Sequence, residues 1–452
     1  MQEDIVIRTL VPVRQATLMF SAVAAFNATT ALAENAPAPS PQESFAIHGQ
    51  VTVVAQGVAG FASPYVGDNS LAPHQVKETV DATLYLGVQP WSGAELWANP
   101  EIDQGFGLSN TLGVAGFPSA EAYKVGKSRP YFRLQRLFVR QTVTLGGERS
   151  AVAGAANQLG GSQSANRLVV TVGKFGVGDV FDTNRFAHDP RADFLNWAIV
   201  DTGSFDYAAD AWGYSYGAAA EWYEGAWTLR LGAFNLSKVP NGEVLETGFG
   251  QYELDAEVEH RHTIGGHPGA VRLAVYRNHG RFARLDAAVA AFNATGAIPD
   301  LATLRRPATR LGGQLNIEQD ITGTLGLFLR AGVSDGRYEA FDFTDIDRTL
   351  AVGASLGGKA WQREADRFGL AMVINGISKQ RQRYLADGGP GILIGDGALP
   401  HPGHEWITEA FYSASVTKGI TLSADYQLIA HPGYNRDRGP ANVLALRLHG
   451  AF

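Results

Sequence analysis

Cysteine, charged residues and long apolar runs are all scarce in this sequence. There is no Cys among the 452 residues, which excludes disulfide bonds and thiolate metal sites. Charged residues make up 18% of the chain, below the quarter that is usual for soluble domains. The net charge of −7 argues against nucleic acid as a partner. After residue 43, no apolar run is long enough for a transmembrane helix. If the chain spans a membrane, it does so without helices.

The N-terminal segment has the pattern of an export signal. Arg8 and Arg14 precede the uncharged stretch ATLMFSAVAAFNATTALA, which ends in a small-x-small triplet. The alternative is an uncleaved membrane anchor, but the apolar part is short and interrupted by Thr and Asn. We therefore expect residues 1–33 to be a cleaved signal peptide. Residues 34–43 are rich in Pro and are expected to form a disordered spacer.

From Ser44 onward, apolar residues recur with a period of two, which is typical of β-strands. Short turns interrupt the pattern, as in TLYLGVQPW-SGA-ELWAN and SASVT-KG-ITLSADYQLIA, and these pairs predict hairpins. Strands do not alternate with helices, so a parallel sheet is not expected. The sixteen expected strands cover residues 44–58, 76–90, 94–100, 131–146, 167–177, 211–223, 226–237, 250–264, 270–281, 308–319, 323–334, 346–358, 366–378, 404–418, 420–431 and 441–452.

The connections between the expected strands alternate in length. Those after even-numbered strands are mostly short, such as WSG, EG, DITG and KG. Those after odd-numbered strands are long: 59–75, 101–130, 178–210, 282–307 and 379–403. The exception is 147–166, a long segment where a short turn is expected. A soluble sandwich has no reason for this asymmetry, whereas outer-membrane barrels have short periplasmic turns, longer extracellular loops and an even strand number.

The two faces of the expected strands differ in polarity. In strand 250–264, Leu254 and Val258 share one face, and Glu253 and Glu257 share the other. A barrel in lipid turns the apolar face outward and the polar face toward its lumen. A soluble antiparallel sheet with one wet face shows the same alternation, but it does not explain the export signal or the turn asymmetry. The sequence therefore predicts an all-β fold over 44–452: a closed antiparallel transmembrane β-barrel of about sixteen strands.

The end of the chain and the aromatic residues fit this fold. The last strand ends on Phe452. In lipid every backbone polar group needs a partner within the protein, so the last strand must pair with the first. An aromatic C-terminal residue also resembles the ends of outer-membrane barrels. Aromatic residues near strand ends are expected to form a girdle at the membrane interface: Trp91, Trp97, Trp222, Trp227, Trp406 and Tyr412.

Four stretches resemble the carbohydrate-selective porins (OprB-type) of Gram-negative outer membranes. They are GFGLSNTLGVAGFPSAEAYKVG, YFRLQRLFVRQT, VTVGKFGVGDVFDTNRFAHDPRADFLNWAIVDTGSFDYAADAWGYSYG and YQLIAHPGYNRDRGPANVLALRLHGAF. The resemblance covers nearly all of the mature chain. It implies a sixteen-stranded barrel in the outer membrane for passive diffusion of glucose and related sugars. The segments 147–166, 282–307 and 379–403 depart from the family's pattern.

The expected partners are outer-membrane lipid and small neutral carbohydrates. Trimers are typical of porins, so a homotrimer is considered, although no stretch of the sequence indicates an interface. Two alternatives remain open. One is a non-conducting barrel that binds surface polysaccharide as a lectin. The other is an exporter of anionic polysaccharide, whose lumen should be strongly basic, whereas the lumen expected here is mixed.

Strand parity assigns many charged side chains to the lumen. The basic ones are Arg136, Arg140, Lys174, Arg230, Arg272, Arg310, Arg330 and Arg447, and the acidic ones are Asp81, Glu253, Asp255, Glu257, Glu259, Glu318, Glu409 and Asp425. We expect a basic sector to face an acidic one across water. The alternative for any single residue is that a wet wall simply carries charge. Arg has a fixed fork of donors that matches vicinal hydroxyls.

Eight of these residues are predicted to line the sugar path: Arg136, Arg140, Lys174, Arg230, Arg272, Arg330, Glu253 and Glu257. Arg136 and Arg140 are the strongest candidates, because they share a face of one strand within a family-like stretch. Arg133 has the opposite parity and is expected at the rim or beyond a β-bulge.

Loop 178–210 contains seven Asp together with aromatic and basic residues. We expect it to fold into the pore as a constriction, with Asp189, Arg191, Asp193 and Trp197 as its key residues. The alternative is a solvated outer loop tied by internal salt bridges.

Nothing in the sequence indicates a cofactor or an enzyme. The stretch DVFDTN offers Asp179 and Asp182 as a weak candidate for Ca²⁺, but it lacks the ligand series of an EF-hand. His260 and His262 are too few for a zinc site. No metal site is otherwise indicated. No catalytic triad or nucleophile motif is visible, so the protein is not expected to be an enzyme.

Overall fold

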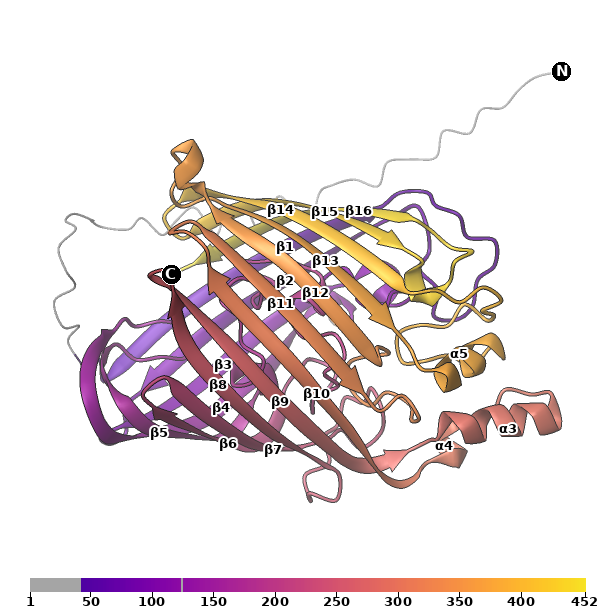
Figure 1. Ribbon diagram of the computed structural model, residues 1–452, viewed down its shortest axis with the longest axis horizontal. Helices are drawn as coiled ribbons and strands as arrows, with labels where there is room; N and C mark the ends of the chain where they lie inside the picture. Colours follow the sequence, from indigo (N-terminus) through magenta and orange to yellow (C-terminus); the bar gives the residue numbers. More distant parts are fainter. Residues whose placement is uncertain (1–41, 123–124) are drawn as a thin grey trace. The chain divides into compact units, whose positions relative to one another are not determined.

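The computed structural model describes residues 42–122 and 125–452, which form a closed β-barrel (Figure 1). The expected signal peptide lies outside the described residues, and so does most of the spacer. The sixteen strands are β1 (Phe45–Val58), β2 (Gln75–Val88), β3 (Ala94–Gly105), β4 (Lys127–Val152), β5 (Gly161–Phe175), β6 (Ser215–Glu224), β7 (Trp227–Asn235), β8 (Tyr252–Ile264), β9 (His267–Phe282), β10 (Arg306–Asp320), β11 (Leu325–Ser334), β12 (Arg348–Gly357), β13 (Arg367–Gly376), β14 (Glu405–Thr417), β15 (Ile420–Ala430) and β16 (Ala441–Ala451).

Short helices occupy the connections. They are η2 (Leu108–Asn110), η3 (Val177–Asp179), α2 (Trp197–Val200), α3 (Leu285–Thr295), α4 (Leu301–Leu304), η4 (Gly358–Trp361), α5 (Lys379–Ala386) and η5 (Pro432–Tyr434). Within the described part of the chain, no helix has the length and apolar character needed to cross a membrane.

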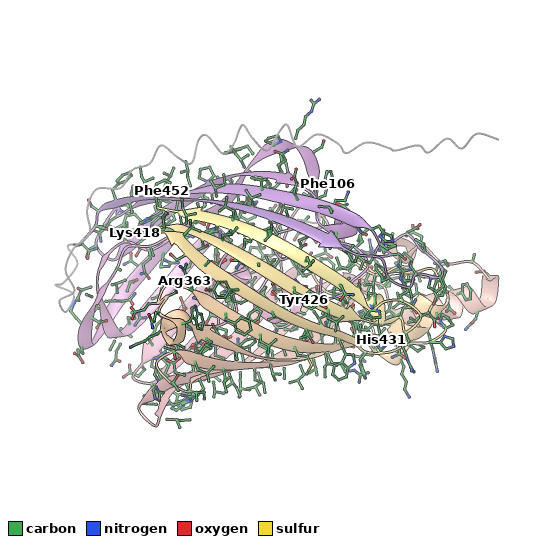
Figure 2. All side chains as sticks on the ribbon, turned by 90° about the horizontal axis from the view of Figure 1, so that it is seen from above. Phe106, Arg363, Lys418, Tyr426, His431 and Phe452 are labelled. Atoms are coloured by element: carbon green, nitrogen blue, oxygen red, sulfur yellow. The ribbon has the colours of Figure 1, made fainter. Side chains whose placement is uncertain are left out.

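Every strand pairs antiparallel with its neighbours in the chain, and β1 closes the barrel against β16 along nine residue pairs. The pairing reaches the last residue, because the Phe452 N–H donates to the Gly49 carbonyl at 3.0 Å and the Gly49 N–H donates back at 3.2 Å. Figure 2 places Phe452 beside Lys418 at one end of the barrel, and His431 lies at the other end. The predicted closure of the last strand on the first is confirmed.

The polarity of the two barrel faces is the reverse of that in a soluble protein. On β8, Leu254 and Val258 are 42% and 37% exposed, whereas Glu253 and Glu257 are 0% and 1% exposed. The exposed apolar residues repeat at alternate positions around the barrel. The predicted orientation, apolar outward and charged inward, is confirmed.

Five of the six residues expected in the aromatic girdle are exposed. Trp222, Trp227, Trp406 and Tyr412 lie at outward positions of β6, β7 and β14, whereas Trp91 lies in the β2–β3 turn and borders the barrel interior. Their place at a membrane interface stays a prediction.

The sixth girdle position, Trp97, is a wrong prediction, because its side chain points inward and is 0% exposed. The Trp97 Nε1 donates to the Glu95 carboxylate at 2.7 Å. Its ring covers Gly87 of β2, where a Cβ would come within 2.6 Å of the ring. A glycine on the neighbouring strand therefore makes the room that an inward Trp needs.

The strand boundaries agree with the sequence except around 147–166. This segment was expected to be a long connection. Instead the β4–β5 ladder continues from Arg149–Ser164 to Val152–Gly161, past register shifts at Gly146, and leaves only residues 153–160 as the turn. Gly146 and Gly147, which suggest a turn in the sequence, have positive φ angles at a bulge within the ladder. The segment is a strand hairpin, which we call the periplasmic hairpin (residues 147–166).

The inside of the barrel is packed with inward-folded loops rather than being an open tube. Parts of the loops after β3, β5, β11 and β15 are buried. Three of these loops meet in an aromatic core: Trp197 stacks on Phe117 with ring centroids 5.3 Å apart and on Phe343 at 5.1 Å. The question for function is therefore which part of the interior stays open.

Candidate functional site

Loop 176–214, which contains the expected constriction 178–210, crosses the barrel interior. Wall carboxylates accept hydrogen bonds of 2.5–3.0 Å from its backbone: Glu257 from Asp182, Glu318 from Arg185, Glu409 from Leu195 and Asn196, and Glu253 from Ala208. These carboxylates belong to β8, β10 and β14. The loop thus lies inside the barrel, as expected, and its role in limiting passage stays a prediction.

Asp206 joins this loop to a second inward loop, 335–347. Its carboxylate accepts hydrogen bonds from four consecutive backbone N–H groups, those of residues 341–344, at 2.7–3.3 Å. It also pairs with Arg310 of β10, and both side chains are 0% exposed. A buried carboxylate with five donors fixes the position of both loops.

The Ca²⁺ hypothesis for Asp179 and Asp182 receives no support from the geometry, because each carboxylate already has protein donors. Asp179 pairs with Arg136 at 2.6 Å. Asp182 accepts from Asn316 Nδ2 at 2.7 Å and lies 3.4 Å from Arg330. Across residues 42–122 and 125–452, no group of three or more acidic or His side chains is placed to hold a metal ion.

Charges on the walls of β7–β10 are paired with one another. Arg230 contacts Glu257 at 2.7 Å and Glu259 at 3.1 Å, and Arg272 contacts Glu259 at 2.8 Å and Glu318 at 3.2 Å. The expectation of a basic sector facing an acidic one across water is wrong for these residues. The opposite charges sit on adjacent strands. Glu257 and Glu318 also accept N–H groups of the inward loop, whereas Arg230, although 5% exposed, lines a cavity between β3–β7 and that loop.

Three other expected site residues are buried in the loop packing. Arg330 and Glu253 are 0% exposed, and Arg330 donates to the Ile199 carbonyl of the inward loop at 2.7 Å. Trp197 is 3% exposed within the aromatic core. Burial of this degree leaves these side chains little access to a passing solute, so their assignment to the sugar path receives no support from the geometry.

Arg191 of the inward loop reaches the wall of β2 and β3. Its guanidinium lies 3.4 Å from Asp81, 3.7 Å from Glu101 and 3.3 Å from Glu121. Burial raises the pKa of the Glu121 carboxyl well above its usual range, although Arg191 acts in the opposite direction. One guanidinium thus holds three carboxyl groups together.

The two other acidic residues expected at the constriction differ from each other. Asp189 is exposed. Asp193 is buried, pairs with Arg367 and accepts the N–H groups of His188 and Asp189 at 3.2 and 3.1 Å. Asp193 therefore shapes the loop, whereas Asp189 remains available to solvent.

Arg136 is clamped between the wall and the inward loop. Its Nη2 and Nε donate to the two oxygens of Asp179 at 2.6 and 2.7 Å, and its Nη1 lies 3.3 Å from the Tyr214 hydroxyl. Burial raises the pKa of the Asp179 carboxyl, but the Arg136 charge outweighs it and leaves the pKa below its usual value. The Asp179 side chain is still 30% exposed, so this ion pair is more accessible to solvent than the ion pairs of β7–β10.

Next to this pair, Arg133 and Lys174 both reach Asp210 of the inward loop, at 3.2 and 3.0 Å. Arg133 points inward in spite of its parity. The β3–β4 register shifts between Asn99 and Pro100, which inserts an extra residue in β4 and turns Arg133 to the lumen. The predicted β-bulge is confirmed.

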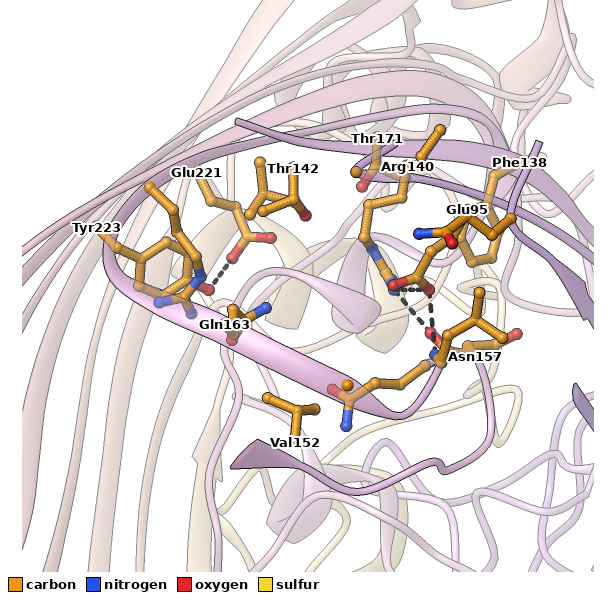
Figure 3. A pocket seen from close by; sticks show the side chains of 18 of the residues that line it. Glu95, Phe138, Arg140, Thr142, Val152, Asn157, Gln163, Thr171, Glu221 and Tyr223 are labelled. Atoms are coloured by element: carbon orange, nitrogen blue, oxygen red, sulfur yellow. Dashed lines mark hydrogen bonds and ion pairs between the residues drawn. The ribbon is translucent and has the colours of Figure 1, made fainter. Parts of the chain in front are cut away.

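A cavity of about 1190 Å³ opens beside this cluster. Its walls are the strands β3–β7, the inward loop and the periplasmic hairpin (Figure 3). Arg140 points into it, donates to the Asn157 carbonyl of the hairpin at 2.7 Å and lies 3.6 Å from Glu95. The Tyr223 hydroxyl donates to Glu221 at 2.7 Å on the opposite side. The cavity thus combines cationic donors, carboxylate acceptors and an aromatic ring.

His188 lines the cavity from the side of the inward loop. Its Nδ1 lies 3.6 Å from Asp201, and its Nε2 lies 3.1 Å from the Gly178 carbonyl. Burial lowers the pKa of His188, but the nearby Asp201 carboxylate outweighs this effect and raises the pKa to about 9. His188 is therefore a cation at neutral pH.

Sequence reasoning missed several residues of this region. Glu95 and Asn157 lie outside the family-like stretches, and Tyr214 lies within one but was not singled out there. Loop 335–347 did leave a signal: its stretch EAFDFTDID has the mixture of Asp and aromatic residues that singled out loop 178–210.

The fold and the site define a transmembrane β-barrel channel of the outer-membrane type. The carbohydrate-selective porin, OprB family, matches residues 68–452. The high pH structure of Pseudomonas putida OprB superposes with a TM-score of 0.69 at 17% identity, over 90% of this chain and 94% of that chain. The low pH structure of Pseudomonas putida OprB gives a TM-score of 0.50 at 13% identity, over 90% and 93%. No curated protein matches the chain.

The chain belongs to the OprB family of carbohydrate-selective porins, since the family match covers most of its length. It is an outer-membrane porin that passes sugars, and it is not an enzyme. At the identities above, the likeness to the solved structures shows the fold alone.

Proposed function

We propose that small neutral carbohydrates pass this barrel along the wall of β3–β6 and through the cavity behind the periplasmic hairpin. The observation that carries this proposal is the cavity of about 1190 Å³, bordered by Arg140, Glu95, Glu221 and Tyr223. Its volume lies above the roughly 300–1,000 Å³ of most small-molecule pockets, so a monosaccharide enters with its water.

The chemistry of the lining suits a polyhydroxylated neutral solute. Arg140 and Glu95 supply a donor and an acceptor side by side, and Glu221 supplies a second acceptor across the cavity. Each group keeps a protein partner, so a sugar hydroxyl exchanges one hydrogen bond for another. Binding then stays weak, which a diffusion channel needs for release.

Arg136 has a positioning role in this proposal. Its bidentate pair with Asp179 fixes the edge of the inward loop beside the cavity. Arg136 and Asp179 together set the width of the approach from the extracellular side, and Arg140 contacts the solute below.

Planar-bilayer recording tests the proposal. The purified protein should give single channels, and added glucose should reduce the ion current in a concentration-dependent way. Arg140→Ala should weaken the block by glucose, and Arg383→Ala on the exposed face of α5 is the matched control. Channels that glucose does not block, or equal block in wild type and Arg140→Ala, would remove the cavity from the sugar path.

We propose that residues 1–33 are removed on export. The mature protein should then begin at Glu34, which an intact-mass measurement would detect.

We also propose a homotrimer, supported by the resemblance to porins. Sedimentation in detergent should give three times the chain mass, and a single chain mass would reject it.

A further inference from the structure

The outer face of β9 carries a row of basic residues toward its extracellular end. Arg277, His279 and Arg281 follow Val275 at alternate positions on the outward face (β9 is labelled in Figure 1). Arg277 stands in register with Leu254 of β8. Leu254 is exposed, so the row continues the lipid-facing surface.

The arginines of this row have neutral protein partners. Arg277 Nη1 lies 3.2 Å from the Tyr252 hydroxyl, and Arg281 Nη2 donates to the Arg305 carbonyl at 3.2 Å. Among the described residues, the hydrogen bonds of these two guanidinium groups go to neutral oxygen atoms. An outward Arg costs about 2–4 kcal/mol at the bilayer midplane and about 0–1 near the interface, so a row of this kind calls for an anion or water beside it.

An apolar groove of about 750 Å³ runs along the outer surface directly below this row. It is bordered by Leu273 and Val275 of β9, Leu315 of β10 and Val333 of β11, with the small residues Gly313 and Ala331 between them. The small side chains leave the hollow, and the larger ones form its rims. Arg277 occupies the next outward position on β9 above Val275.

A third arginine, Arg348, borders the groove from the other side. Val275, Gly313, Val333 and Arg348 stand in one register across β9–β12. Three strand spacings separate β9 from β12, which is roughly 14 Å. Arg348 Nη2 donates only to a backbone carbonyl, that of Ile377 at 3.0 Å, among the contacts of the described residues. The groove thus has an apolar floor and guanidinium groups on both sides of its extracellular end.

We infer that this groove binds an acyl chain of a phosphate-bearing lipid of the outer leaflet, with the lipid phosphates on Arg277, Arg281 and Arg348. Charge complementarity selects this occupant. Guanidinium groups bind phosphate through paired N–H donors, and the apolar groove below them takes a hydrocarbon chain.

Native mass spectrometry of the protein, purified from outer membranes in a mild detergent, tests the inference. Wild type should carry a phosphorylated lipid, and the triple variant Arg277→Ala, Arg281→Ala, Arg348→Ala should lose it by about ten-fold or more, equivalent to one decade in affinity. The control is Lys379→Ala with Arg383→Ala, which removes exposed charge from α5. Equal lipid retention in the triple variant and the control would overturn the inference.

Two further arms separate lipid from other occupants. Ala331→Leu fills the groove and should lower lipid retention, whereas Ala410→Leu on the outer face of β14 should not; equal retention in the two rejects the groove. Nanodiscs made with the phosphorylated lipid or with its enzymatically dephosphorylated form should retain lipid only in the first case, and equal retention rejects the role of phosphate. An oligomer mass, dimeric or trimeric, that the triple variant abolishes would assign the surface to a second copy and overturn the lipid assignment.

Discussion

Inside the barrel, the wall of β8–β14 and the wall of β3–β6 carry similar charges in different surroundings. We call them the closed wall and the open wall. On the closed wall, Glu253, Glu257 and Glu409 accept hydrogen bonds from the backbone of the inward loop and are buried. On the open wall, Arg140 and Glu95 keep about a fifth to a quarter of their side chains exposed beside the cavity. The same residue types therefore hold loops on one side and border an open cavity on the other.

This difference teaches that a charged lumen residue is not by itself a pore residue. A wall carboxylate that accepts a loop N–H fixes the position of the inward loop, and only the charges that the loops leave uncovered reach the water. Strand parity gives the direction of a side chain. The fold of the loops decides its function.

The largest effect is expected from Asp206, which joins both inward loops on the closed wall. Asp206→Ala leaves the buried Arg310 and four backbone N–H groups without their acceptor, and breaking a buried pair of this kind costs about 3–5 kcal/mol of folding free energy. Asp179→Ala, on the wetter side, should cost clearly less. Urea titration of the refolded barrel, followed by heat-modifiable mobility, measures both. Equal losses would erase the distinction between the walls.

A smaller loss of folding free energy is expected when a charge is placed on the apolar outer face. Leu327→Arg places a charge on the exposed outer side of β11 and should cost about 2–4 kcal/mol if it lies near the midplane. Thr142→Arg, which points into the cavity, is the inward control. The same titration applies, and a control that is as damaging as Leu327→Arg would contradict the assignment of the faces.

On the open wall, the double variant Arg136→Ala, Arg140→Ala should keep the barrel folded and weaken sugar binding. The expected loss is about 1–2 kcal/mol, because each charge-assisted hydrogen bond competes with water. Removing two positive charges should also shift ion selectivity toward cations. Liposome swelling with glucose and with a neutral non-sugar of similar size tests the first effect, and reversal potentials test the second. A parallel change for both solutes with unaltered selectivity would take these arginines out of the path.

The smallest expected effect is a change of ion selectivity with pH. The pKa of His188 is raised to about 9 in the folded protein, above the usual value of about 6.5. Its charged pair with Asp201 therefore contributes fully below about pH 6.5 and is lost as pH rises through about 9. Cation selectivity should increase over that window, because the loop edge loses a positive charge. Reversal potentials between pH 6 and 10 measure the shift, and His188→Gln should show none of it. An identical shift in that variant would assign the titration to another group.

The fold was predictable from local pattern. The alternation of apolar and polar residues predicted sixteen strands and the outward face of Leu254. The alternation of short and long connections predicted which end of the barrel faces the periplasm. Both patterns depend on residues that are close in the sequence. Trp97 escaped this reasoning, since its inward orientation depends on Gly87 of the neighbouring strand. The periplasmic hairpin escaped it as well, because Gly146 and Gly147 form a bulge where a turn was the simpler interpretation.

The site was less predictable because its contacts join distant parts of the chain. Asp206 and Arg310 are 104 residues apart, and Asp182 and Arg330 are 148 apart. Parity placed these arginines in the lumen correctly, yet it contains no information on which loop would cover them. The loop composition indicated that segment 178–210 turns inward, but it did not indicate which wall it would leave open.

Cysteine accessibility tests most directly whether the open wall carries the path, since the native chain has no Cys to interfere. Thr142→Cys lies on the cavity, and Ser355→Cys points inward from β12 of the closed wall and is buried. In a planar bilayer, a charged water-soluble thiol reagent should lower the conductance of Thr142→Cys and leave Ser355→Cys unchanged. A fall in the conductance of Ser355→Cys, together with an unchanged conductance of Thr142→Cys, would contradict a path along the open wall.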